Sequence, residues 1–250
     1  MKRIIKNINN NKLYQLGKRI HGDKIFSSAN NLTKAEMSKE AKRYDVLNFL
    51  AEKINAQNYL EIGIGNPDNN YNLIKIKNKY AVDPGVEFEL NLADFKITSD
   101  EFFLQLNENK LEISNEIKFD IIFIDGLHLA YQVERDIINS IQFLSDNGFI
   151  VLHDCNPPTE YHARETYNFI NGPAKGFWNG TTWKAFVQAR TEYYSCCIDS
   201  DWGVGVLSKN ARPCLNKLSF NENPYFDFNI FNEKRAEHLN LLSFDQFSAC

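Results

Sequence analysis

The sequence lacks a long apolar run, and this absence excludes several classes of protein. No window approaches the roughly 18 uninterrupted apolar residues that a membrane-spanning helix needs. The first twenty residues contain six Lys or Arg and no acidic residue, but they also lack the apolar segment of a secretory signal. Cysteine is scarce, and the five residues have an odd number and spacings that match no zinc site or disulfide framework. We therefore expect a cytoplasmic protein without a membrane span.

A strong excess of charge is absent as well. The 250 residues carry a formal net charge of -4, and 24% of them are charged and 43% apolar, which is ordinary for a globular protein. The negative balance argues against nucleic acid as a partner. The basic residues near the start are interpreted either as a solvated terminus or as an arm for an anionic partner. A chain of this length can form one domain with additions.

Residues 40–155 alternate between helical and strand patterns. The predicted strands are continuous apolar runs, which are typical of a parallel sheet covered by helices on both faces. Two later runs are separated by a short turn, and a connection of that length can only join antiparallel strands. The sequence therefore predicts a doubly wound, Rossmann-like α/β fold with a seven-stranded, mostly parallel sheet and an antiparallel C-terminal hairpin. The predicted strands cover residues 58–62, 79–83, 95–98, 119–125, 149–153, 193–198 and 202–208, and helices are predicted over 38–54, 71–76 and 128–144.

Two threonines are expected to mark helix starts. Thr98 and Glu101 have the spacing of a capping box, which predicts a helix that begins after Thr98. Thr181 is expected to cap a second helix, which follows a stretch rich in Gly and Pro. We divide the chain into an N-terminal extension that is helical or irregular (1–37), one domain (38–209) with an insertion (156–182), and a C-terminal extension (210–250).

Polar residues follow several of the predicted strands at the points where the strands end. In an open α/β sheet, ligands bind at the carboxyl ends of the strands. A single carboxylate at such an end is as often a turn or capping residue as a functional one. Several of them at one edge of the sheet favour a binding site. The residues at these ends are Glu61, Gly63, Gly65, Asp83, Asp125 and Asp154.

The loop after the first strand carries Gly63 and Gly65 but not the third glycine of a dinucleotide-binding loop. The third position is Asp68, whose charge repels a pyrophosphate. The loop therefore suits a nucleoside ligand without phosphates better than NAD, and an NAD-dependent oxidoreductase is kept as an alternative. Asp83 ends the second strand about 20 residues further on, where a carboxylate can accept hydrogen bonds from ribose hydroxyls.

Several of these segments resemble motifs of class I S-adenosylmethionine-dependent methyltransferases, namely YLEIGIG at 59–65, VDP at 82–84 and FDIIFIDGLH at 119–128. The segments 98–103, 151–157 and 201–206 resemble the methyltransferase 24 subgroup, which has relatives among sugar and macrolide O-methyltransferases. The resemblance implies S-adenosylmethionine as cofactor, with its methionine part at the glycine loop, its ribose at Asp83 and its adenine near Thr98 and Ser99. The cofactor-binding residues implied in this way are Glu61, Gly63, Gly65, Asp83, Thr98, Ser99 and Asp125.

Methyl transfer to a sugar or alcohol requires a base, a metal ion or both, because a neutral hydroxyl is a poor nucleophile. Asp125 and Asp154 end neighbouring strands, and their carboxylates can share a divalent cation such as Mg²⁺. Asn156 follows Asp154 after one intervening residue and is the third candidate metal ligand. The resemblance implies that Asp125 and His128 form the Asp-x-x-His of the macrolide-sugar relatives, which supplies a metal ligand and a general base. We take these two as the catalytic residues.

The same residues also allow other roles. His128 can be a solvent-facing side chain at a helix start, and orientation alone can drive transfer to a stronger nucleophile without a metal. His153 precedes Asp154 on its strand and is expected to point to the opposite face, as a core residue. Aromatic residues of the insertion suit a sugar or an aromatic acceptor, or form a small core of the insertion itself. The candidate acceptor-binding residues are Tyr161, Trp178 and Trp183.

The sequence therefore predicts a methyltransferase that uses S-adenosylmethionine. We expect its acceptor to be a hydroxyl group of a sugar, a sugar conjugate or another small molecule. The alternatives are an NAD-dependent oxidoreductase and a methyltransferase-like module that binds a partner without catalysis. A homo-oligomer is a candidate assembly, and nucleic acid is not an expected partner.

Overall fold

The computed structural model describes residues 11–86, 90–168 and 170–250 of the chain. Its strands are β1 (Asn58–Ile62), β2 (Asn78–Val82), β3 (Phe119–Ile124), β4 (Leu144–Leu152), β5 (Tyr194–Ile198), β6 (Val204–Ser208) and β7 (Leu241–Leu242). They form one sheet in the order β2-β1-β3-β4-β6-β5-β7. β1 pairs in parallel with β2 and β3, and β3 with β4, whereas β6 runs antiparallel to both β4 and β5. This arrangement confirms the predicted doubly wound fold with its antiparallel hairpin.

The seventh strand is not the one that the sequence predicts. Residues 95–98 form no ladder, and Phe95 makes only an isolated bridge to Val82. The reason is that Thr98 starts a helix at once, with its side chain accepting a hydrogen bond from the amide of Glu101 at 3.2 Å. The predicted helix start is therefore confirmed and the predicted strand is wrong. The sheet instead gains β7 at its far edge, in parallel with β5.

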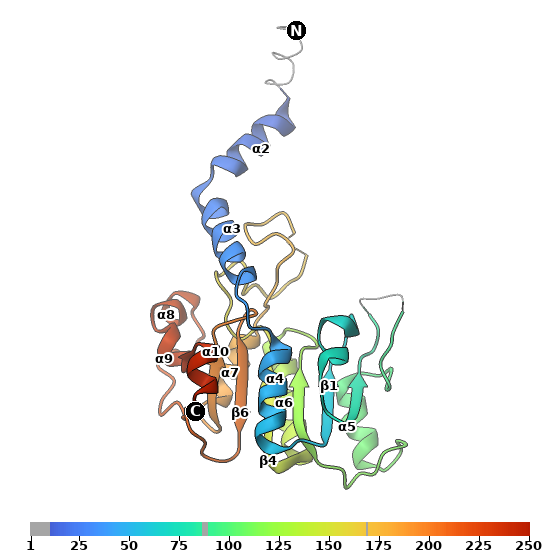
Figure 1. Ribbon diagram of the computed structural model, residues 1–250. Coiled ribbons are helices and arrows are strands. Elements are labelled where there is room, and N and C mark those ends of the chain that lie inside the picture. The colour runs from blue at the N-terminus through green and yellow to red at the C-terminus, as the bar shows by residue number, and fades with distance from the viewer. Residues whose placement is uncertain (1–10, 87–89, 169) are drawn as a thin grey trace.

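Helices cover both faces of the sheet (Figure 1). The helices of the described residues are α2 (Lys12–Gly22), α3 (Lys24–Met37), α4 (Arg43–Ile54), α5 (Ser99–Asn107), α6 (Ala130–Phe143), α7 (Thr182–Ala189), α8 (Phe228–Glu233), α9 (Arg235–Leu239) and α10 (Phe244–Ser248), and all but α2 and α3 pack around the sheet. The helix predicted over 71–76 is wrong, since the chain forms two 3-10 turns, η1 (Pro67–Asn69) and η2 (Tyr71–Leu73). The side chain of Asn66 accepts a hydrogen bond from the amide of Asp68 at 3.1 Å, and such local bonds compete with a regular helix.

The central strands are buried on both faces. Along β3, Phe119, Ile122 and Ile124 pack on the face covered by α5, α6 and α7. Ile121 and Phe123 pack on the opposite face, which α4 and α10 cover. These five side chains are at most 2% exposed, as expected of a parallel sheet between two helical layers.

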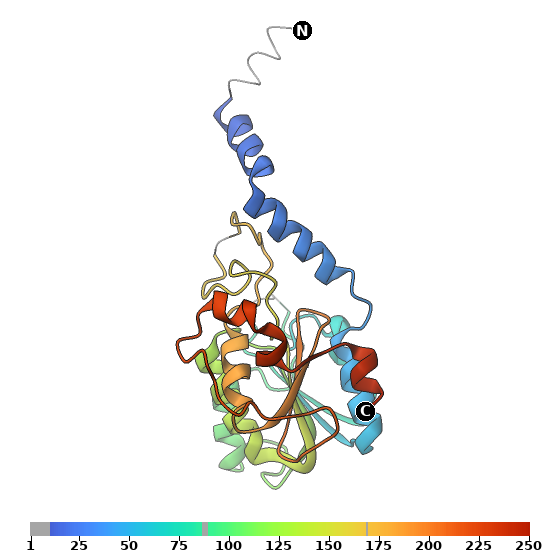
Figure 2. The same ribbon diagram turned by 90° about the vertical axis from the view of Figure 1, so that its left-hand side faces the viewer.

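The two N-terminal helices project away from the sheet, and α3 runs beside the insertion (Figures 1 and 2). α2 leaves apolar side chains exposed, among them Leu13 and Leu16. α3 buries Thr33 and Glu36, and the Thr33 hydroxyl lies 3.0 Å from Nε2 of His162 in the insertion. Among the residues that the structure describes, none of the helices combines the length and the apolar character needed to cross a membrane.

The C-terminal segment is built into the domain. The ring of Phe231 in α8 packs on Trp183 of α7, with ring centroids 4.3 Å apart, and both side chains are buried. Arg190, which is 1% exposed, donates a hydrogen bond to the carbonyl of Glu237 in α9 at 2.8 Å. This bond attaches α9 to the end of α7. Residues 210–250 therefore contribute a strand and core side chains to the sheet domain, and the boundary at residue 209 stays a prediction.

A disulfide joins Cys214 and Cys250, whereas the sequence predicts none. The two residues are separated by 36 positions and are brought together by the path of the C-terminal segment, which their spacing does not indicate. Cys155, Cys196 and Cys197 are free and buried, in keeping with cysteine as a small apolar residue.

Replacing Phe231 with alanine is expected to lower the free energy of unfolding by about 3–5 kcal/mol, because the change removes a buried ring. The control is Tyr225→Ala, an aromatic residue of the same segment that is 93% exposed. This control should change the free energy by less than about 0.5 kcal/mol. Urea unfolding of both variants measures the difference. Equal effects would contradict the placement of the C-terminal segment in the core.

Candidate functional site

A cavity of about 750 Å³ lies at the carboxyl ends of β1, β2, β3 and β4. The structure brings together here all seven residues that the resemblance assigns to the cofactor. They are Glu61, Gly63, Gly65, Asp83, Thr98, Ser99 and Asp125, and each lines the cavity. A larger groove of about 1150 Å³ runs along α4 and α10, but none of the predicted site residues, all of which the structure describes, lines it.

The glycine loop after β1 is shaped by a close approach of two backbones. Gly63 has a φ of 85°, and any side chain there would collide with the carbonyl group of Asp125. The amides of Ile64 and Gly65 donate to Oδ2 of Asp83 at 3.0 and 3.2 Å. Asp83 therefore ties the loop to the end of β2 and fixes this wall of the cavity.

Glu61 is a buried carboxyl group on the same wall, 1% exposed. Its Oε2 accepts hydrogen bonds from the Tyr59 hydroxyl at 2.6 Å and from Nδ2 of Asn70 at 2.9 Å. Burial raises the pKa of Glu61 to about 8, although both hydrogen bonds act in the opposite direction. At neutral pH this carboxyl group is therefore mostly protonated.

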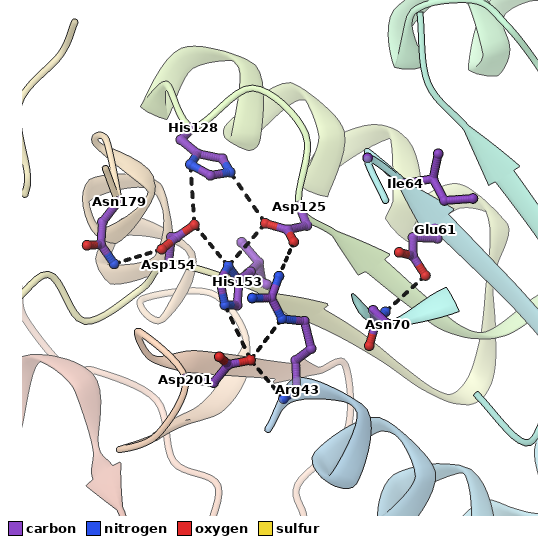
Figure 3. A network of polar contacts seen from close by, with 12 residues as sticks. Arg43, Glu61, Ile64, Asn70, Asp125, His128, His153, Asp154, Asn179 and Asp201 are labelled. Atoms are coloured by element: carbon purple, nitrogen blue, oxygen red, sulfur yellow. Dashed lines mark hydrogen bonds and ion pairs between the residues drawn. The ribbon is translucent and has the colours of Figure 1, made fainter. Parts of the chain in front are cut away.

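Two carboxylates and two imidazoles converge where β3 and β4 end (Figure 3). Oδ1 of Asp125 lies 3.3 Å from Nε2 of His128 and 3.1 Å from Nδ1 of His153. Oδ2 of Asp154 lies 3.3 Å from Nδ1 of His128 and 2.9 Å from Nδ1 of His153. Each imidazole thus bridges both carboxylates, and we call these four residues the Asp–His cluster.

The outer oxygens of the two carboxylates have partners of their own. Arg43, the first residue of α4, forms an ion pair with Oδ2 of Asp125 and donates from Nε to Asp201 at 2.8 Å. Asn179 donates to Oδ1 of Asp154 at 2.8 Å. Burial alone would lower the pKa of Arg43, but the carboxylates of Asp125 and Asp201 outweigh it and raise that pKa. The guanidinium therefore stays charged between the two acids.

The same carboxylates control the charge of the imidazoles. Burial would lower the pKa of His128, but Asp154 and Asp125 raise it to about 9. The pKa of His153 is also raised, because these carboxylates outweigh burial and the charge of Arg43. Burial would raise the pKa of Asp125, and His153 together with Arg43 lowers it instead. At neutral pH both imidazoles therefore carry a proton and balance the acids.

His153 belongs to the site, whereas the sequence analysis expected it in the core on the opposite face. β4 ends just before it, and Asp154 has a φ of 62°, so the chain turns and strand alternation no longer separates the two side chains. Arg43 and Asp201 are site residues that the sequence analysis missed. Asp201 begins the segment 201–206, whose resemblance to the subgroup was a usable signal. No local pattern marks Arg43.

The predicted acceptor residues lie in three different places. Trp178 lines the cavity and stacks on the ring of His128, with centroids 5.2 Å apart. Tyr161 is partly exposed and is not among the residues that line the cavity. Trp183 is 1% exposed within the core of the domain. We therefore keep Trp178 as a candidate acceptor contact and leave the other two out.

The insertion is fixed to the start of α6. The amide of Thr181 donates to the carbonyl of His128 at 2.8 Å, and its hydroxyl oxygen accepts from the amide of Ala130 at 2.7 Å. Thr181 is the N-cap residue of α7, as predicted, but its side chain makes no hydrogen bond to that helix and instead accepts from the first amide of α6. Beside it, Phe177 and Trp202 line the cavity with stacked rings, 5.3 Å between centroids. The insertion therefore brings aromatic surface next to His128.

His162 links this insertion to α3. Its Nε2 lies 3.0 Å from the Thr33 hydroxyl, and its Nδ1 lies 2.8 Å from the hydroxyl of Thr159. Its ring lies 5.8 Å from that of Trp202. Burial, together with the nearby charge of Arg164, lowers the pKa of His162 to about 4. The Thr33 hydroxyl donates to the carbonyl of Ala29 at 2.9 Å, so Nε2 of His162 donates to Thr33 and Nδ1 of the neutral imidazole accepts from Thr159.

The Asp–His cluster fits a divalent cation. Asp125, His128 and Asp154 each offer one ligand atom, and these atoms lie within 4.8 Å of one another. Carboxylate oxygens and an imidazole nitrogen are ordinary ligands for such ions. Asn156 lies elsewhere, since its Nδ2 donates to Oδ1 of Asp199 at 2.9 Å. We therefore leave Asn156 out of the proposed ligand set.

Comparison with known proteins gives a family and several similar structures. A family model described as a methyltransferase domain matches residues 72–155. The O-methyltransferase from Bacillus cereus, in complex with SAH, is 14% identical, and the match covers 75% of this chain and 91% of that one with a TM-score of 0.43. The O-methyltransferase TomG from Streptomyces achromogenes, in complex with SAM, is 13% identical, and the match covers 76% of this chain and 91% of that one with a TM-score of 0.41. An SAH-bound methyltransferase from Podospora anserina is 15% identical, and the match covers 81% of this chain and 97% of that one with a TM-score of 0.43. No curated protein sequence matches the chain.

These TM-scores are low, so the identification depends on the family match and the site. The match runs from η2 to the residues after β4 and includes Asp83, Asp125 and Asp154 of the cavity. Residues 72–155 thus match a methyltransferase domain, and the sheet order and the glycine loop are those that the resemblance to class I S-adenosylmethionine-dependent methyltransferases predicts. The matched family is the methyltransferase 24 group, which the motifs resemble.

Acidification is expected to destabilise the folded protein through His162, because protonation charges a buried imidazole and removes the acceptor that faces Thr159. Because the pKa of His162 in the folded protein is about 4, below its ordinary 6.5, the stabilisation is complete above pH 6.5 and is lost as the pH falls toward 4. The loss should amount to at most roughly 3 kcal/mol. Unfolding free energies of the parent and of His162→Gln at several pH values measure it. The parent should lose more stability than the variant, and parallel pH profiles would overturn this prediction.

Proposed function

We propose that the protein transfers the methyl group of S-adenosylmethionine to a hydroxyl group of a sugar or another small hydroxylated acceptor, with His128 as general base. The observation that supports this most is the position of His128 at the cavity. It lies 3.3 Å from both Asp125 and Asp154 and is stacked on Trp178. A base at an aromatic wall can reach the hydroxyl of an acceptor that packs on that wall.

The cofactor is proposed to occupy the part of the cavity between β1, β2 and α5. The loop of Gly63 and Gly65 would hold the methionine part, and Asp83 the ribose. Thr98 and Ser99 would lie beside the adenine. This assignment follows the resemblance to class I methyltransferases, and it is supported by the fact that all these residues line one cavity.

In the proposed reaction, the neutral form of His128 takes the proton of the acceptor hydroxyl while the oxygen bonds to the methyl carbon. A divalent cation at Asp125 and Asp154 would favour this neutral form, because its positive charge lowers the pKa of His128, which is about 9 without it. The bond between that carbon and sulfur breaks, and its electron pair stays on sulfur. The products are a methyl ether, S-adenosylhomocysteine and a protonated His128, which Asp125 and Asp154 stabilise. A divalent cation such as Mg²⁺, held by Asp125 and Asp154, would supply positive charge that lowers the pKa of a hydroxyl and of the neighbouring imidazole.

The acceptor is proposed to pack against the aromatic side chains of the cavity. Phe177, Trp178 and Trp202 line the cavity there, and the flat apolar faces of a sugar or phenol suit aromatic side chains. We include a cytoplasmic location in the proposal, with Cys155, Cys196 and Cys197 free, whereas the Cys214–Cys250 disulfide is more typical of an oxidising compartment. A homo-oligomer is included because α2 exposes the apolar side chains of Leu13 and Leu16.

Replacing His128 with glutamine is expected to lower kcat by about a hundredfold to ten-thousandfold, because the acceptor hydroxyl loses its base. Affinity for S-adenosylmethionine should stay within about threefold, since the change spares the glycine loop. Labelled-methyl transfer to a panel of sugars, nucleotide sugars and phenols measures kcat, and calorimetry measures binding. The control is His238→Gln, a histidine of α9 outside the cavity lining. An unchanged kcat in His128→Gln would refute the general-base role.

Removal of divalent cations is expected to lower methyl transfer at least about tenfold, with recovery when Mg²⁺ is added. The Asp154→Ala variant should show a low rate that neither EDTA nor Mg²⁺ alters. The control is Asp146→Ala, on the same strand but fully exposed, which should respond to EDTA as the parent does. Transfer that survives both chelation and Asp154→Ala would sink the metal proposal.

A further inference from the structure

The helix α3 is held against the rest of the protein by polar side chains. Its buried residues are Ala29, Thr33 and Glu36, which lie on one face of the helix because they are spaced by four and three positions. Some of its apolar side chains are exposed, among them Ile25 and Met37. In the described part of the chain, no residue of α3 belongs to the clusters of buried apolar side chains that form the core. Directional hydrogen bonds therefore determine where α3 lies.

Glu36 joins α3 to the aromatic wall of the cavity, which consists of Phe177, Trp178 and Trp202. Its Oε1 accepts a hydrogen bond from the backbone amide of Trp202 at 2.8 Å. Its Oε2 accepts from Nζ of Lys39, which lies just beyond the end of the helix. Glu36 itself is not among the residues that line the cavity. Lys39 thus orients the buried carboxylate, and the carboxylate acts on the cavity through the Trp202 backbone.

The backbone of Trp202 is held on both sides of its ring. Its carbonyl oxygen accepts hydrogen bonds from the amide of Asn156 at 2.9 Å and from Nδ2 of Asn179 at 3.2 Å. Its φ of 67° is a left-handed conformation, which a bulky residue keeps only where its surroundings impose it. The hydrogen bond to Glu36 supplies the restraint on the amide side. It therefore contributes to the direction in which the indole ring leaves the backbone.

The same helix contacts the insertion, which carries the rest of the aromatic wall. Besides the hydrogen bond that His162 donates to α3, Oδ1 of Asn30 accepts from Nζ of Lys175 at 3.0 Å. Two residues after Lys175, the ring of Phe177 stacks on that of Trp202, with centroids 5.3 Å apart. Both views of the molecule show α3 beside the insertion (Figures 1 and 2). One helix therefore contacts the two segments that supply the stacked pair of rings.

We propose that Glu36 is a positioning residue of the acceptor site, through which α3 holds Trp202 against Phe177 in the geometry that receives the acceptor. The inference rests on the proposed function, because it takes the aromatic wall as the surface on which the acceptor packs. The proposed cofactor residues belong to the part of the cavity between β1, β2 and α5. A change of Glu36 should therefore affect the acceptor and spare S-adenosylmethionine.

The environment of the Trp202 ring can be measured without an acceptor. The chain has three tryptophans, so the full chain labelled with 5-fluorotryptophan gives three fluorine NMR resonances, and Trp202→Phe identifies the one from Trp202. Glu36→Ala should shift or broaden this resonance, because the Trp202 amide loses its acceptor. The resonance of Trp183, which is buried in the core, should stay in place. A Trp202 resonance that does not change in Glu36→Ala would overturn the inference.

Two conservative variants separate positioning from the loss of an ion pair. Glu36→Gln removes the charge that pairs with Lys39 but keeps an oxygen that can accept from the Trp202 amide, so the resonance should match that of the parent. Glu36→Asp keeps the charge but is one methylene shorter, so its oxygen withdraws from the amide and the resonance should move. A resonance that moves in Glu36→Gln or stays in Glu36→Asp would overturn the positioning role. If Glu36→Ala does not fold, which thermal denaturation reports, these two variants still decide the question.

Steady-state kinetics give the functional readout. The probe is the compound that the parent methylates fastest in the panel of sugars, nucleotide sugars and phenols. In Glu36→Ala, KM for this compound should rise about tenfold, which is the size of effect expected when a hydrogen bond to a charged group is lost. KM for S-adenosylmethionine should stay within about threefold, because the glycine loop is unchanged. The control is Glu40→Ala, an exposed carboxylate just beyond α3, which should leave both KM values unchanged.

Failure of this inference and failure of the proposed function give different results. If the parent methylates a compound of the panel and Glu36→Ala shows the same KM for it, the inference is wrong and the proposed function stands. An equal rise of both KM values would indicate a general loosening of the cavity and would also overturn the inference. Absence of methyl transfer to every compound of the panel would overturn both proposals.

Discussion

One partly buried cation, Arg43, connects parts of the chain that are far apart in sequence. Its side chain pairs with Asp125 at the end of β3, and its side chain and backbone amide both donate to Asp201 in the turn between β5 and β6. Buried carboxylates without such a partner are costly. The parallel half of the sheet, the antiparallel hairpin and the first helix of the domain are therefore joined at the point where the Asp–His cluster forms.

The backbone around the cluster is held in conformations that side chains rarely adopt. Asp154, Asp201 and Trp202 have φ values of 62°, 47° and 67°. Left-handed conformations at residues other than glycine cost free energy, and they persist where the surrounding contacts impose them. In this protein those contacts are the ion pairs of Arg43 and the packing of Trp202 on Phe177. The surrounding packing thus maintains the strained backbone that presents the acids and the aromatic wall.

The sequence predicts the site where function depends on strand ends. Asp83, Asp125 and Asp154 could be placed at one edge because apolar runs show where parallel strands stop. Strand alternation could not place His153, because a residue of left-handed conformation follows it. The role of Arg43 could not be predicted for another reason, since it depends on Asp125 and Asp201, which lie in two loops far away in the sequence. A short edge strand such as β7, added late in the chain, likewise leaves no periodic pattern.

The cap that Thr181 provides has a consequence for how the acceptor side can change. Its hydroxyl and amide bind the backbone at His128 and Ala130, so the insertion and the start of α6 form one mechanical unit. In many enzymes a loop that selects the substrate can be exchanged while the reactive group stays in place. In this protein the two are fastened together. A change of the insertion that suits a new acceptor must therefore keep these two hydrogen bonds. Without them, the position of the His128 imidazole would shift.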